Sequence, residues 1–265
     1  MLAKFSLEQI REFWTQQAKE HGQAPAASWS DQMVIQMEIR EILKQLSNGD
    51  HILDVGCANG YSTVQFASQL TARIRGVDNI PEMIAQARQR LGDFNGQLAS
   101  SVEFAEGDVM ALAEPSAAYD KVVATRVIIN LGEWARQKTG LAECARVLKP
   151  GGLLLLSEAT LQGWRRLNEF RKEWLLDEIS IPPFNQYLDE ELVIGALSPH
   201  LDLVELVNFA STYYVGTRVL KPLLSRALGG TIDVANPLME WNRWFSQLPP
   251  WGDYGTQKLF VFRKR

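Results

Sequence analysis

The sequence feature that most limits the fold is a short apolar run that ends at two closely spaced glycines. Residues 51–55 (HILDV) are followed by residues 56–60 (GCANG), and a helical pattern comes next. A second apolar run, residues 73–77, ends at Asp78. A strand, a glycine turn, a helix and a second strand that ends in an acid form the first half of a nucleotide-binding βαβ unit. The chain is therefore predicted to build an α/β fold around a parallel sheet.

The turn and the terminal acid have the chemistry of a site for an adenosine-type ligand. Gly56 and Gly60 lack a Cβ, so the backbone can turn sharply and a ligand can lie against it. Asp78 can accept hydrogen bonds from both hydroxyls of a ribose. The spacing differs from the G-x-G-x-x-G pattern of dinucleotide-binding proteins, because no third glycine is present and Asp54 stands just before the turn. A carboxylate there repels a diphosphate and attracts a ligand that carries an ammonium or sulfonium group.

Residues 54–60 (DVGCANG) resemble the first motif of the class I S-adenosylmethionine (SAM)-dependent methyltransferases. A second stretch, residues 146–152 (RVLKPGG), is similar to the turn that precedes the fifth strand in the same family. The commoner family motif has a third glycine where this chain has Ala58, and we expect a right-handed backbone there, which alanine tolerates. The resemblance covers residues 30–160. It implies a Rossmann-like, seven-stranded methyltransferase sheet with an antiparallel last strand, SAM as cofactor and S-adenosylhomocysteine (SAH) as product.

The resemblance also assigns residues to the cofactor. Asp108 would receive the adenine amino group, although a turn-forming role explains the same residue. Arg126 would hold the SAM carboxylate or the substrate, with a plain ion pair as the alternative. An ordinary turn without a ligand is the alternative for the motif as a whole. The full predicted cofactor set is Asp54, Gly56, Cys57, Ala58, Gly60, Asp78, Asn79, Met83, Asp108, Val109 and Arg126.

Apolar periodicity predicts the elements, and the resemblance implies that they form three parts. A helix ending near Leu148 is predicted before the fifth strand, and residues 164–179 are predicted to form an amphipathic helix with Trp174 and Leu175 on its buried face. The expected parts are an N-terminal helical lid (1–46), a SAM-binding core (47–160) and a third part (161–265) with helical lid and acceptor-pocket elements, the last two strands (201–209 and 257–262) and an inserted segment between them (212–255).

Candidates for the acceptor site come from the lid segments and from the ends of the fourth and fifth strands. Trp29 would be a lid aromatic, or it packs on the core. Glu158, at the end of the fifth strand, and the many Trp and Tyr residues favour a cationic nitrogen acceptor, although core packing explains most of the aromatics. An oxygen acceptor needs a base, for which His21, Glu158 and His200 are the candidates. The predicted substrate-binding residues are Trp29, Asn130, Glu158, Asn185, Tyr187, Tyr213 and Tyr214.

Composition and charge exclude several classes of partner. The chain has 27 basic and 31 acidic side chains and a net charge of −4, without the basic clusters that nucleic-acid binding needs. Cys57 and Cys144 do not indicate a disulfide, and no metal-ligand spacing is present. The longest apolar run, residues 153–156, cannot span a bilayer, and the first residues do not resemble a signal peptide. We expect a cytoplasmic monomer or homodimer with a small-molecule substrate and no metal.

The sequence therefore predicts methyl transfer from SAM to a nitrogen of a small molecule in natural-product metabolism. Holding the two reactants in line supplies about 7–11 kcal/mol of the barrier reduction. One alternative is O-methylation of a sugar or polyketide-type substrate, because residues 185–190 and 252–255 resemble bacterial natural-product methyltransferases. A second is a non-catalytic SAM-binding regulatory or interaction module. A third, a nicotinamide oxidoreductase, is disfavoured by the missing third glycine.

Overall fold

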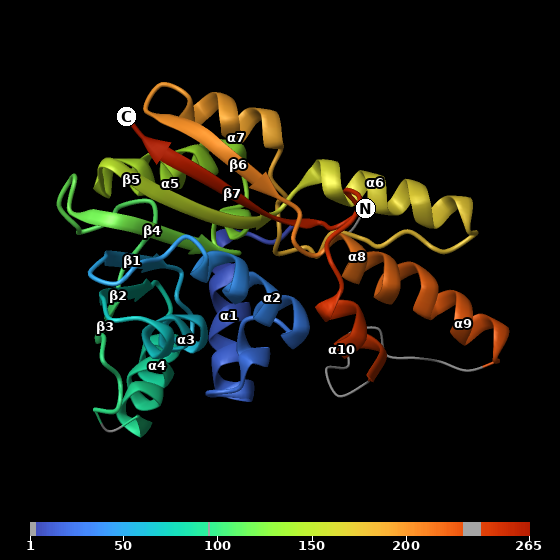
Figure 1. The fold of residues 1–265 in the computed structure, drawn as a ribbon, viewed down its shortest axis with the longest axis horizontal. Helices are drawn as coiled ribbons and strands as arrows, with labels where there is room; N and C mark the ends of the chain where they lie inside the picture. Colours follow the sequence, from blue (N-terminus) through green and yellow to red (C-terminus); the bar gives the residue numbers. More distant parts are fainter. Residues whose placement is uncertain (1–3, 95, 230–239) are drawn as a thin grey trace.

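The computed structural model describes residues 4–94, 96–229 and 240–265. Its centre is a seven-stranded sheet of order β3-β2-β1-β4-β5-β7-β6 (Figure 1). Strands β1 to β5 run parallel to one another, whereas β7 is antiparallel to both β5 and β6, as predicted. The strands are β1 (His51–Val55), β2 (Arg73–Asp78), β3 (Ser101–Glu106), β4 (Tyr119–Thr125), β5 (Leu148–Ala159), β6 (Leu201–Val207) and β7 (Gln257–Lys264).

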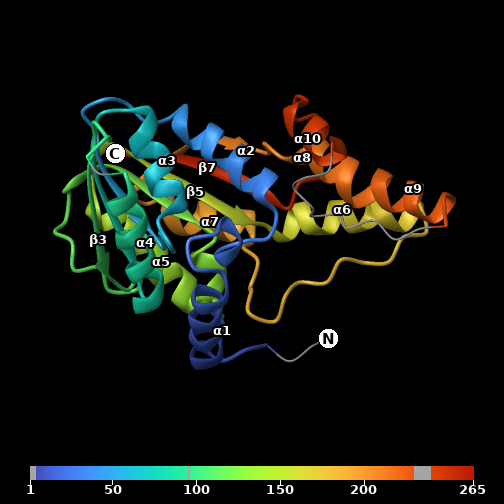
Figure 2. The same cartoon turned by 90° about the horizontal axis from the view of Figure 1, so that it is seen from below.

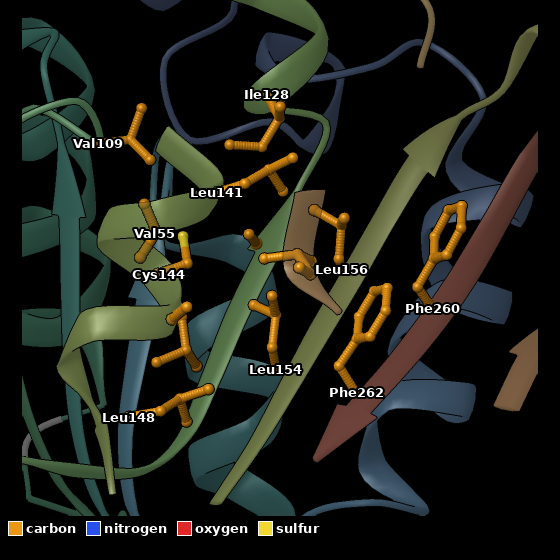
Figure 3. Packing of buried hydrophobic residues seen from close by; sticks show 14 of the residues in the cluster. Val55, Val109, Ile128, Leu141, Cys144, Leu148, Leu154, Leu156, Phe260 and Phe262 are labelled. Atoms are coloured by element: carbon orange, nitrogen blue, oxygen red, sulfur yellow. The ribbon is translucent and has the colours of Figure 1, made fainter. Parts of the chain in front are cut away.

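Helices cover both faces of this sheet, so its central strands are apolar on both sides. Leu154 and Leu156 of β5 pack with Leu141 of α5 in one cluster, which Figure 3 shows beside Phe260 and Phe262 of β7. Leu153 and Leu155 point the other way and pack with residues of α2. One face carries α2 (Gln32–Leu43), α3 (Tyr61–Gln69) and α4 (Pro81–Asp93), and the other carries α5 (Trp134–Val147) and α7 (Glu190–Leu197).

Helix α1 (Leu7–His21) lies outside these two layers, as Figure 2 shows. It begins at a capping box, in which Ser6 and Gln9 exchange side-chain to backbone hydrogen bonds. Its start is joined to the loop after α6, because the Phe5 amide donates to the Pro183 carbonyl at 3.1 Å. Near its other end, buried Ala18 packs against the residues that follow β2. The helix therefore crosses the carboxyl edge of the sheet.

Two predicted helix boundaries were wrong. Leu148 does not end α5 but begins β5, where it pairs with Tyr119. Helix α6 (Leu161–Glu173) ends early, and Trp174 and Leu175 are 50% and 82% exposed instead of buried. The chain reverses there because the Arg171 guanidinium binds the carbonyl of Asp177 through Nε at 2.9 Å and Nη2 at 2.6 Å.

The segment between β6 and β7 forms helices that extend with α6 to one side of the sheet in Figure 1. Arg218 in this segment makes an ion pair with Asp31, the N-cap of α2. The described elements are α8 (Ser211–Tyr214), the π-helical η3 (Val215–Leu220), α9 (Lys221–Ala227) and α10 (Glu240–Gln247).

Candidate functional site

A cavity of about 390 Å³ lies between the carboxyl ends of β1 to β4 and helix α1. Its sheet side is formed by the segments that directly follow these strands. Its other side is one face of α1, made of Leu7, Glu8, Ile10, Arg11 and Trp14. Strand ends in open α/β sheets are the usual place for ligands. Ten of the eleven predicted cofactor residues line this cavity: Asp54, Gly56, Cys57, Ala58, Asp78, Asn79, Met83, Asp108, Val109 and Arg126.

The turn after β1 is left-handed at three positions. Gly56, Ala58 and Gly60 have φ of +71°, +47° and +71°. A Cβ on Gly56 would also lie 2.6 Å from the Cβ of Val127, so only glycine fits there. The expectation of a right-handed backbone at Ala58 was wrong. Ala58 is left-handed, at the position where the commoner family motif has a glycine, the residue that adopts this conformation most readily. Gly60 is the N-cap of α3 and lies outside the cavity lining.

Two carboxylates face each other across this turn. Asp54 is 1% exposed; its Oδ2 accepts a 2.6 Å hydrogen bond from Thr63, while its Oδ1 has no partner among the described residues. Burial raises the pKa of Asp54 to about 7, against the opposing effect of Thr63. Asp78 accepts the amides of Ala58 and Ile80, each at 2.9 Å, and burial raises its pKa to about 6. The free oxygen of Asp54 is a ready acceptor for a cationic or N–H group in the cavity.

Asp108 lies in the segment after β3, and the sequence predicts either a turn-forming role or an adenine contact for it. Its Oδ1 accepts the amide of Met110 at 2.9 Å, which is a turn-forming contact. Asp108, Val109 and Met110 nevertheless border the cavity, so the turn places them against whatever binds there.

The exit of β4 brings Arg126 and Asn130 to the cavity wall. Arg126 is left-handed (φ +54°), and its guanidinium makes a buried ion pair with Glu38 of α2. The Trp29 ring lies 5.3 Å from this guanidinium and packs on the α2 side of the core, outside the cavity lining. Asn130 donates to the Arg126 carbonyl at 2.6 Å and accepts from Trp14 Nε1 at 3.3 Å. The loop at the β4 exit and helix α1 are therefore joined by a direct hydrogen bond.

Other predicted acceptor residues are part of the buried core. Glu158 is 0% exposed, and its Oε1 accepts the amides of Val127 at 2.9 Å and Ile128 at 2.7 Å. Burial raises the pKa of Glu158 to about 8. Tyr213 and Tyr214 lie in the core on the α2 side of the sheet, where burial raises the pKa of both hydroxyls. None of these three residues lines the cavity.

The remaining candidates are also outside the lining. His21 is exposed at the end of α1. His200 is exposed just before β6, which runs parallel to β5, and so it lies at the amino edge of the sheet, opposite the cavity. Asn185 and Tyr187 belong to a loop that is bonded to the β4 exit through the Gln186 amide and the Ile129 carbonyl, at 2.7 Å.

The sequence did not predict that one face of α1 lines the cavity, although the apolar residues of this face are visible in the sequence. Leu7, Ile10 and Trp14 share a helical face in the sequence, which periodicity alone assigns to a core. Asn59 was also missed: its Nδ2 donates to the carbonyls of Gly22 at 2.9 Å and Ala24 at 2.8 Å. The glycine turn is thereby bonded to the segment that follows α1.

Across residues 4–94, 96–229 and 240–265, no three His, Cys, Asp or Glu side chains are grouped as metal ligands. No described helix has both the length and the apolar character needed to cross a bilayer.

The chain is similar in sequence to a methyltransferase family and to several curated enzymes. Residues 52–152 match the family model described as a methyltransferase domain. O-methyltransferase cnsE of Penicillium expansum is 33% identical over 121 residues, which are 45% of this chain and 42% of that protein. Carboxy-S-adenosyl-L-methionine synthase of Colwellia psychrerythraea is 31% identical over 170 residues, which are 60% of this chain and 68% of that protein. The chain spans about half the length of the curated O-methyltransferases it matches.

Solved structures extend the likeness to the whole chain. Magnesium protoporphyrin IX methyltransferase of Synechocystis PCC 6803, a structure with bound SAH, superposes with a TM-score of 0.63 over 98% of this chain and 100% of that chain. The two sequences are 13% identical, so this likeness concerns the fold.

Proposed function

The chain belongs to the class I SAM-dependent methyltransferases, and on this premise we propose that it transfers a methyl group from SAM to a small molecule bound under α1. The observation that carries the proposal is the pair of carboxylates beside the left-handed turn. Asp54 has a buried oxygen without a partner among the described residues, and Asp78 ends β2 at the cavity. An ammonium group and a ribose, both present in SAM, fit these two acceptors.

The residues of the cavity have simple roles in this proposal. SAM, when bound, supplies a methyl group on a positively charged sulfur, which is activated for in-line displacement. Gly56 and Ala58 let the backbone approach the cofactor, and Asp108 with Val109 would hold the adenine. The apolar side chains of α1, Leu7, Ile10 and Trp14, cover the cavity and exclude water. Positioning alone then accounts for about 7–11 kcal/mol of catalysis.

For the acceptor atom we propose a nucleophile that needs no strong base. No histidine is among the described residues that line the cavity. The preference for a nitrogen acceptor rested on Glu158 and on lid aromatics such as Tyr213 and Tyr214, and these three lie outside the lining. A neutral amine and an acidic, ionised hydroxyl both meet the requirement, and the names of the curated relatives favour the hydroxyl. The ¹³C shift of the product methyl group assigns the atom.

We also propose a natural-product substrate and a cytoplasmic location. The relatives named O-methyltransferases and 27-O-demethylrifamycin SV methyltransferase support the first. The free thiols of Cys57 and Cys144, both buried, agree with a reducing compartment.

The proposal is tested by calorimetric titration of the protein with SAH and, separately, with NADH. We expect SAH to bind and NADH not to bind. Asp78→Asn should weaken SAH binding about tenfold or more, because the ribose loses a charged acceptor. Glu106→Gln is the matched control, since Glu106 is the neighbour of Asp78 on β3, is exposed and does not line the cavity. Binding of NADH alone would contradict the proposal.

A further inference from the structure

The loop at the exit of β4 lies between the cofactor turn and α1. On one side, Val127 packs so closely over Gly56 that a Cβ there would be 2.6 Å from the Val127 side chain. On the other side, Asn130 accepts a hydrogen bond from Trp14 of α1. Any shift of this loop therefore changes both the space above the glycine turn and the position of α1.

The backbone of this loop is in a conformation that needs outside support. Arg126 is left-handed, which residues with a side chain rarely adopt unless their surroundings hold them there. Its amide donates to the Ser157 carbonyl at 2.9 Å, and its carbonyl accepts from Asn130 at 2.6 Å. Its guanidinium is paired with Glu38. The amide, carbonyl and guanidinium of Arg126 thus each have a partner, but none of these interactions holds the backbone amides of Val127 and Ile128.

Glu158 supplies the missing support from β5. A single oxygen, Oε1, accepts both the Val127 amide at 2.9 Å and the Ile128 amide at 2.7 Å. The side chain is 0% exposed and does not line the cavity. Without it, both amides would be buried donors that have lost their partner.

We infer that Glu158 is a positioning residue, which acts through its length and its accepting oxygen to hold residues 126–130 between the cofactor turn and α1. This inference rests on the proposed function, since it makes cofactor binding depend on a residue that does not touch the cofactor. The carboxyl group acts as a hydrogen-bond acceptor here, and its charge is not required.

The test compares Glu158→Gln with Glu158→Asp. Gln keeps the length and an accepting oxygen but not the charge, and it is a close mimic at pH 7 because burial raises the pKa of Glu158 to about 8. Asp keeps an ionisable carboxyl group but is one methylene shorter and cannot reach both amides. We expect the Kd for SAH to stay within about twofold in the Gln variant and to rise about tenfold in the Asp variant. Amide hydrogen exchange of residues 126–130 should rise only in the Asp variant.

Controls separate this role from stability and from the proposed function. Val193→Ala removes buried apolar volume from the same α5-side core at a residue outside the cavity lining, so it should lower Tm and leave the Kd for SAH unchanged.

Weakened SAH binding in the Gln variant, together with unchanged binding in the Asp variant, would overturn the inference, because the charge would then carry the role. If the Asp variant does not fold, exchange in the Gln variant decides: unchanged exchange supports the inference, and faster exchange overturns it. Failure of the wild-type protein to bind SAH contradicts the proposed function, whereas the exchange comparison is made without ligand and tests the loop independently.

Discussion

At the scale of single residues, three carboxyl groups at the carboxyl edge of the sheet have raised pKa values. Burial raises the pKa of Asp54 to about 7, of Asp78 to about 6 and of Glu158 to about 8, from ordinary values of 3.8 to 4.5. The folded state therefore holds protons that the unfolded chain releases. The resulting contribution to stability is fully present below the ordinary values and is lost as the pH rises through 6 to 8.

The same shift predicts a pH-dependent affinity for SAM. A cationic ligand near the free oxygen of Asp54 favours the ionised carboxylate, so binding releases a proton when the pKa starts near 7. The Kd for SAM should therefore fall about tenfold between pH 6 and pH 8. Calorimetry in two buffers of different ionisation enthalpy measures both the affinity and the proton release. Asp54→Asn should abolish this dependence, and an affinity that is constant over the range in the wild type would contradict it.

At the scale of elements, α1 is anchored differently from the sheet and its covering helices. Of its residues only Ile10 and Ala18 are buried, and its middle is held by an aromatic contact with the loop after α6. There the Phe13 and Phe184 rings stack at 4.3 Å, with Trp14 edge-on to Phe184 at 5.6 Å. A helix with so few buried contacts opens more readily than a core element. We therefore expect α1 to open and close over the cavity.

Phe184→Ala tests this attachment. Loss of the aromatic pairs, each worth about 1 kcal/mol, should raise the dissociation rate of SAH about fivefold. Hydrogen exchange should become faster in α1 and stay unchanged in the sheet. Trp174→Ala is the control, because Trp174 is 50% exposed and lies outside the cavity lining. Unchanged exchange in α1 of the Phe184 variant would show that other contacts hold the helix.

At the scale of the whole molecule, a buried polar network joins the N-terminal helices to the segment between β6 and β7. Asp31, 1% exposed at the start of α2, pairs with Arg218 and accepts from the Tyr213 hydroxyl at 2.8 Å. The Asn242 amide of α10 donates in turn to Tyr213 at 3.1 Å. Segments far apart in the sequence are thus held by shared hydrogen bonds, and the C-terminal helices support α2 from the side away from the cavity.

Asp31→Asn should be strongly destabilising. It leaves the Arg218 guanidinium in the interior without its counter-charge, which lowers the free energy of unfolding by about 3–5 kcal/mol. Urea denaturation at pH 7 measures this change. Arg265→Ala removes an exposed pair with Asp202 and should give no measurable change. Equal effects of the two substitutions would show that the buried pair contributes no more than a surface pair.

The sequence by itself determined those structural features that depend on only a few neighbouring residues. The bounds of β1, the start of α4 at Pro81 and the capping box of α1 follow from an apolar run before a glycine turn, from the proline ring and from side-chain caps. The glycine turn and the acid at the end of β2 predicted the edge of the sheet at which the cavity lies. The reason is again local, because a strand end, a sharp turn and an acid are each recognised from a few consecutive residues.

Only the tertiary structure decided which side chains meet at the cavity. Periodicity gives α1 an apolar face but not its partner, so Trp14 and not Trp29 lines the cavity. Glu158 and Tyr213 are polar residues that looked available, yet packing buries both and gives them hydrogen-bonding partners far away in the sequence. Ala58 is left-handed although its own preference is right-handed. Such outcomes depend on contacts between distant segments, and the free energy of those contacts outweighs local preference.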